Sequence, residues 1–126
     1  MSMSSTRSGM IAATLKLDDV QKKAAKTVLD DAFKAAAPLR LALTDARQKL
    51  GAAVQAGDQA QIDQAASAYA EQATAMATAE AQAVAKIVKT LKTEQLNPAA
   101  VQTTVSLMRG AFVGKKWDTA PDVRFY

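Results

Sequence analysis

The sequence contains neither cysteine nor histidine. Without cysteine no disulfide can form and no thiolate nucleophile is available. Without histidine the chain lacks the side chain that most often acts as a base near neutral pH, together with the usual ligand of zinc and copper. We therefore predict that the protein is not an enzyme, and we predict no catalytic residue, no cofactor-binding residue, no metal-binding residue and no cofactor.

Bulky apolar side chains are also scarce. Aromatic residues make up only 5% of the chain, and much of its 49% hydrophobic content is alanine. Alanine is the best helix former but fills little core volume, so this composition favours slim contacts between helices. A slim pair of helices leaves much of its apolar stripe in water, and a second copy of the chain is the simplest way to cover that stripe. The composition therefore predicts a homodimer.

No run of apolar residues approaches the about 20 needed to span a membrane, so we predict no membrane insertion. No alternating strand pattern occurs either, and the sequence predicts an all-α fold. Residues 1–14 form a Ser/Thr-rich stretch without an effective signal-peptide core, which we interpret as a disordered lead. This start fits either a cytoplasmic protein or a mature form whose leader has been replaced.

The helix signals follow one another along the chain. Asp18 and Gln21 have the spacing of a capping box, and a helical stripe follows until Pro38, which predicts either a kinked helix or two helices in tight succession. Gly57-Asp58 indicates a stop and a new cap, before a helix from 59 to about 90. Asn97-Pro98 starts a short last helix. These signals predict a long antiparallel helical hairpin with short flanking helices, one domain over 15–114, and an irregular tail over 115–126.

The charge is uneven along the chain. The net charge is +4, yet residues 50–85 contain no Lys or Arg, so most of the basic residues lie in 16–49 and 86–116. Because the predicted hairpin brings 86–92 back beside 16–30, both basic segments gather at one end. They form either an ordinary solvated face or a basic binding surface. Basic residues are interleaved with Asp and aromatics are few, so we predict no nucleic-acid binding.

Two short motifs carry a family resemblance. The segments Leu17-Asp18-Asp19-Val20-Gln21 and Leu91-Lys92-Thr93-Glu94-Gln95 resemble the Leu-Thr-x-x-Gln motif that occurs twice in the Spy/CpxP family of periplasmic proteins. Between them lie Pro38-Leu39-Arg40, a Gly-Asp turn and a long Ala/Gln helix, in the order of the family, and the resemblance covers roughly residues 15–110. The motif threonine is replaced twice. Asp18 can still cap a helix, whereas Lys92 cannot accept a backbone N–H bond. The motif residues are Leu17, Asp18, Gln21, Leu91, Glu94 and Gln95.

This resemblance implies an intertwined, cradle-like α-helical dimer in the periplasm, of secreted origin, with the leader absent from this chain. The family includes ATP-independent chaperones, inhibitors of envelope-stress sensor kinases and metal-responsive sensors. Its metal-binding branches rely on histidine, so we expect the chaperone-like function: binding of partly folded clients through apolar patches edged with Lys and Arg. The alternatives are a regulatory module that docks an envelope-stress sensor domain, and a metal-responsive sensor. The candidate client-binding residues are Lys22, Lys26, Phe33 and Lys89.

Overall fold

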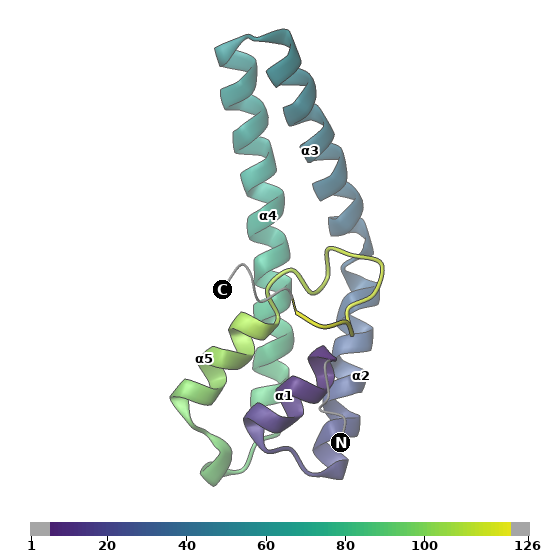
Figure 1. The fold of residues 1–126 in the computed structure, drawn as a ribbon, viewed down its shortest axis with the longest axis vertical. Coiled ribbons are helices and arrows are strands. Elements are labelled where there is room, and N and C mark those ends of the chain that lie inside the picture. The colour runs from purple at the N-terminus through teal and green to yellow at the C-terminus, as the bar shows by residue number, and fades with distance from the viewer. Residues whose placement is uncertain (1–5, 122–126) are drawn as a thin grey trace.

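The computed structural model describes residues 6–121, and within this range all regular structure is helical (Figure 1), which confirms the all-α prediction. Along the chain the elements are α1 (Arg7–Leu15), α2 (Asp19–Ala35), α3 (Ala37–Ala56), α4 (Gln59–Val88), the single 3-10 turn η1 (Thr93–Gln95) and α5 (Pro98–Leu107). Helices α3 and α4 pair with one another and extend beyond the other helices. We call α3, together with the part of α4 that pairs with it, the arm. The helices α1, α2 and α5 surround the lower part of α4 and form the base.

The arm depends on a tight turn between its two helices. Gly57 adopts a left-handed conformation with φ of 71°, which glycine reaches without a steric penalty, and its N–H closes the end of α3. Asp58 then caps α4 by accepting a bond from the N–H of Ala60. At the other end of α3, Pro38 stands in its first turn, where its missing N–H costs nothing. Of the two alternatives at this proline, the structure therefore shows two helices in immediate succession, separated by Ala36.

The main core lies in the base, where α1, α2, α4, α5 and the segment after α5 contribute buried residues to one cluster. Ile11 and Leu15 come from α1, Leu29 from α2, Ile87 from α4 and Phe112 from the segment after α5, and each is at most 1% exposed. In the arm the buried residues Leu43, Ala46 and Ala53 lie outside this cluster. Most of the stabilisation from apolar burial is therefore concentrated at the base.

The predicted disordered lead is wrong over much of its length, because residues 7–15 form helix α1. Thr6 caps this helix, and Ile11 and Leu15 bury its apolar side against the core. Residues 1–5 lie outside the described residues. The predicted tail is irregular over 115–121, but Trp117 is only 4% exposed and belongs to the core cluster. The packed domain is therefore larger than 15–114 at both ends.

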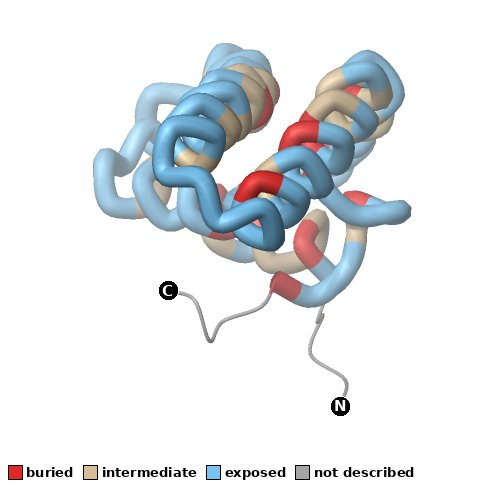
Figure 2. The backbone as a smooth tube through the Cα atoms, turned by 90° about the horizontal axis from the view of Figure 1, so that it is seen from above, coloured by how far each residue is buried: buried red, intermediate tan, exposed pale blue. Residues whose placement is uncertain are grey.

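Seen along the arm, buried residues lie mainly where helices face one another, while exposed residues cover the outer sides (Figure 2). Several large apolar side chains nevertheless face solvent. Leu41 and Val54 in α3 are 74% and 60% exposed, and Val20 in α2 is 78% exposed. None of the helices described is both long enough and apolar enough to cross a membrane.

Candidate functional site

The first motif forms the start of α2. The Asp18 carboxylate accepts a 2.8 Å bond from the N–H of Gln21, and the Gln21 Oε1 accepts a 2.9 Å bond from the N–H of Asp18. This is the capping box that the spacing predicts. The Gln21 N–H bond, supported by the nearby Lys92 ammonium, holds the pKa of Asp18 below its usual value. Leu17, immediately before the cap, is buried in the core cluster.

The second motif follows the end of α4 and repeats half of this arrangement. The N–H of Lys92 donates a 2.8 Å bond to Gln95 Oε1, as the N–H of Asp18 does to Gln21. The reverse bond is missing because a lysine side chain has no acceptor. Instead the Lys92 ammonium lies 3.6 Å from the Asp18 carboxylate, so the two residues that replace the motif threonine face one another as an ion pair.

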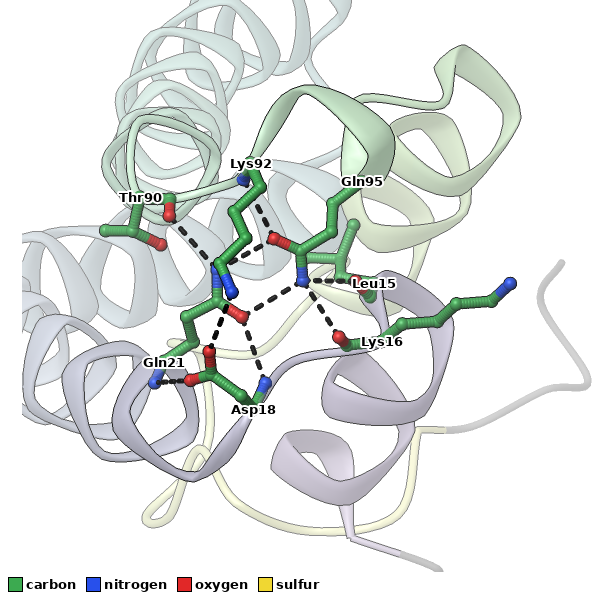
Figure 3. A network of polar contacts seen from close by, with 7 residues as sticks. All are labelled: Leu15, Lys16, Asp18, Gln21, Thr90, Lys92 and Gln95. Carbon is green, nitrogen blue, oxygen red and sulfur yellow. Dashed lines mark hydrogen bonds and ion pairs between the residues drawn. The ribbon is translucent and has the colours of Figure 1, made fainter.

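The two motif glutamines meet side chain to side chain (Figure 3). Gln21 Nε2 donates to Gln95 Oε1 at 2.8 Å, and Gln95 Nε2 donates to Gln21 Oε1 at 3.0 Å. Each amide also reaches the residue that precedes the other motif: Gln21 donates to the carbonyl of Thr90 at 3.1 Å, and Gln95 to that of Lys16 at 2.8 Å. The two motif copies therefore make matching contacts with one another. We call Gln21 and Gln95 the glutamine pair.

The glutamine pair has a structural role. Both N–H bonds of each amide and both oxygens have partners, so no donor or acceptor is left for a ligand. The pair ties the start of α2 to the segment after α4 and so closes the base. Leu91 is half-buried against the core, whereas Glu94 is exposed at η1 and takes no part in these contacts.

The lysine candidates divide between a groove and open surface. A groove of about 530 Å³ runs between α1 and α2, with Ile11, Leu17 and Leu29 among its apolar lining, and Lys22 and Lys26 also line it. Lys89 is exposed at the end of α4 and is not among the residues that line this groove. We call this feature the α1–α2 groove.

Phe33 is half-buried and takes part in the packing of the base. Its ring lies 6.2 Å from that of Phe112 in an edge-to-face arrangement, and the Arg40 guanidinium lies 4.0 Å from its centroid. Arg40 also donates to the carbonyls of Phe33 and Phe112, which fixes the segment after α5 against α2. Phe33 is one of the predicted client-binding residues, and this contact gives it a structural role as well.

A second hollow, of about 290 Å³, lies on the other side of Lys26, where the segment after α5 crosses α2. Trp117 is its central residue: the indole N–H donates a 2.8 Å bond to Asp30, and the Lys26 ammonium lies 5.7 Å from the ring centroid. We call it the Trp117 pocket; its lining residues are Lys26, Asp30, Phe33, Lys34, Lys115, Lys116, Trp117 and Asp118. Sequence reasoning missed it, although a sole tryptophan next to two lysines was a visible signal.

The start of α1 holds this segment in place. The Arg7 side chain is buried, and its guanidinium donates to the carbonyls of Leu107 at 2.7 Å and Trp117 at 2.6 Å. Asp118 accepts bonds from both the N–H and the hydroxyl of Ser8, each at 2.8 Å. Arg7 and Asp118 were not among the predicted site residues, because their partners lie a hundred or more residues away in the sequence.

A carboxylate from α4 supports the same segment. Burial raises the pKa of Glu80, although backbone N–H groups of Phe112 and Gly110 and the charge of Arg7 favour its ionised form. The positive φ of Gly110, 73°, shapes the turn that carries these N–H groups. Among residues 6–121, no three Asp or Glu side chains come close enough together to hold a metal ion.

Comparison with known proteins adds no assignment: no family model, no curated protein and no solved structure matches this chain. The features of this chain that bear on function are therefore the grooves and charges of the base.

Proposed function

We propose that the protein is an ATP-independent, chaperone-like protein that binds partly folded polypeptides, and that it acts in the periplasm as the motif resemblance implies. The α1–α2 groove carries this proposal, because it combines an apolar lining with two lysines from α2. A partly folded chain exposes apolar side chains that such a groove can cover, and a groove of this size holds a few side chains at a time. No bound nucleotide is needed for this mode of binding.

The lysines and the apolar lining have separate tasks in this proposal. Exposed charges act over a Debye length and speed the encounter with an acidic client, whereas apolar burial holds the client afterwards. Lys22 and Lys26 are both exposed. Lys22 lies 3.8 Å from the exposed Asp19 and Lys26 lies over the Trp117 ring, and both ammonium groups still face solvent, where they contribute to the encounter.

We expect the double substitution Lys22→Glu and Lys26→Glu to raise, by about fivefold, the protein concentration that suppresses aggregation of an acidic unfolded client at about 0.1 M salt. At about 1 M salt the Debye length is only about 3 Å, so the wild type and this variant should encounter the client at similar rates and suppress its aggregation at similar concentrations. The measurement is light scattering of a reduced, unfolded client. A thermal melt of the variant checks that the loss of the Lys26–Trp117 contact has not unfolded the base.

Lys23→Glu together with Lys86→Glu is the matched control, because it makes the same change in charge at exposed positions that line neither the α1–α2 groove nor the Trp117 pocket. If both double variants suppress aggregation equally at low salt, the groove lysines form only a solvated face. Tight binding of one sensor domain would then favour the regulatory-module alternative.

We also propose that the working unit is an intertwined homodimer with a cradle-like shape, in which two antiparallel α3–α4 hairpins cover one another. The exposed Leu41 and Val54 support this, since α3 contributes no buried residue to the main core. We expect light scattering at roughly 10–50 µM to give twice the chain mass of 13.3 kDa. Leu41→Lys with Val54→Lys should shift the mass toward one chain, whereas Val20→Lys, on the exposed side of α2, should not. A wild-type monomer at these concentrations would contradict the dimer.

A further inference from the structure

The Trp117 pocket has a composition that the α1–α2 groove lacks. Four lysines line it, two from α2 and two from the segment after α5, and they outnumber its two aspartates. Its floor is aromatic, since Phe33 and the buried Trp117 lie among these charged side chains. Two segments that are about eighty residues apart in the sequence therefore build one basic and aromatic hollow.

The two aspartates are already hydrogen-bonded, whereas none of the four lysines is in an ion pair with another residue of the described range. Asp30 accepts the Trp117 indole N–H, and Asp118 accepts two bonds from Ser8. The ion pairs found among residues 6–121 join Lys22 to Asp19, Lys49 to Asp45 and Lys92 to Asp18, so none of them involves a lysine of this pocket. The excess positive charge of the pocket is available to a partner.

We propose that the Trp117 pocket binds an acidic polypeptide segment, in which Asp or Glu side chains pair with Lys34, Lys115 and Lys116 while a neighbouring apolar side chain contacts Phe33. This inference rests on the proposed function and names the chemical class of the client segment. Lys26 lines both the pocket and the α1–α2 groove. An extended client can therefore continue from one into the other, with its acidic part over the four lysines and its apolar part in the groove.

The geometry of Trp117 disfavours the two other anionic partners. Nucleic-acid binding would use a free aromatic face for base stacking, but the Lys26 ammonium occupies the region over this ring. Anchoring in a lipid surface would use an exposed indole, but Trp117 is 4% exposed and its N–H is bonded to Asp30. An acidic peptide needs neither a free aromatic face nor an exposed indole. It requires only the lysines and an apolar contact at Phe33.

The only tryptophan of the chain lies in this pocket, so its fluorescence reports binding there directly. The probe is a short unstructured peptide in which Asp and Glu flank leucines, without Trp or Tyr, and the control peptide carries Asn and Gln instead. We expect the acidic peptide to shift the emission of the full chain with a Kd of about 10–100 µM, and the neutral peptide to bind at least about tenfold more weakly.

Lys115→Gln with Lys116→Gln should weaken binding of the acidic peptide about tenfold, whereas Lys23→Gln with Lys86→Gln should leave it unchanged. Equal affinity in the two variants, equal affinity for the two peptides, or no binding by fluorescence and calorimetry would overturn the inference. Tighter binding of anionic lipid vesicles or of a single-stranded oligonucleotide would also overturn it. If aggregation is suppressed through the α1–α2 groove but the peptide does not bind, only the pocket inference fails. If the peptide binds but no aggregation is suppressed, the proposed function fails.

Discussion

Replacing Gln21 with alanine is expected to lower the free energy of unfolding by about 1–3 kcal/mol, because the substitution removes several part-buried hydrogen bonds at once. Gln21 is 7% exposed, and its amide joins the N–H of Asp18, the carbonyl of Thr90 and the amide of Gln95. Gln95, the other member of the glutamine pair, bonds to neither Asp18 nor Thr90 and so does not replace these contacts. Chemical denaturation followed by circular dichroism measures the loss. Gln55→Ala, at an exposed position in α3, is the control and should change stability by less than about 0.5 kcal/mol.

A double-mutant cycle tests whether the two motifs stabilise the fold as a unit. Gln95→Ala alone removes the same pair of amide bonds from the other side, so the double variant should be less destabilised than the sum of the single variants. We expect a coupling of about 1–2 kcal/mol. Additive losses would show that the reciprocal bonds between the amides contribute nothing, and that each glutamine acts only as a local cap.

Phe112→Ala should be the most damaging single substitution in the base, with a loss of about 3–5 kcal/mol. Phe112 is 0% exposed, packs edge-to-face on Phe33 and lies where Arg40 and Glu80 hold the backbone of its segment. The cavity would open between α2, α4 and the segment after α5, so the surroundings can collapse only partly. Urea denaturation provides the measurement. The next residue supplies the control: Val113 is 51% exposed, and Val113→Ala should cost less than about 0.5 kcal/mol. A similar loss in the two variants would mean that this segment is not packed as described.

The parts of the fold that local chemistry determines were predictable. Asp18, Gly57 and Asn97 end or begin helices at the predicted places because their caps depend on residues within one turn. Asp58 also caps its helix, by accepting a bond from the N–H of Ala60. The sequence leaves the conformation at Pro38 open, since a kinked helix and two successive helices have the same apolar pattern. Only the tertiary packing of α2 and α3 decides between them.

The parts that long-range contacts determine were not predictable. Helix α1 is short and weakly patterned, and its polar anchor, Arg7, depends on carbonyls of Leu107 and Trp117. The motif glutamines were identified from the family resemblance, but the sequence gives no sign that they bond to one another. The same holds for the candidate binding residues: Lys22 and Lys26 line a groove, Phe33 is partly committed to packing, and Lys89 lines neither the groove nor the Trp117 pocket. The pocket itself arises only when residues 115–118 cross α2.

The contact between α1 and the segment around Trp117 has a consequence for the order of folding. During synthesis α1 leaves the ribosome early, whereas its partner carbonyl on Leu107 follows 100 residues later. Helices α3 and α4 can pair as soon as both exist, because their contacts are local around Gly57. Helix α1 therefore has no complete set of partners until residues 107–118 have been made, and its docking together with Trp117 follows the pairing of α3 with α4. The Trp117 pocket forms only at this later step.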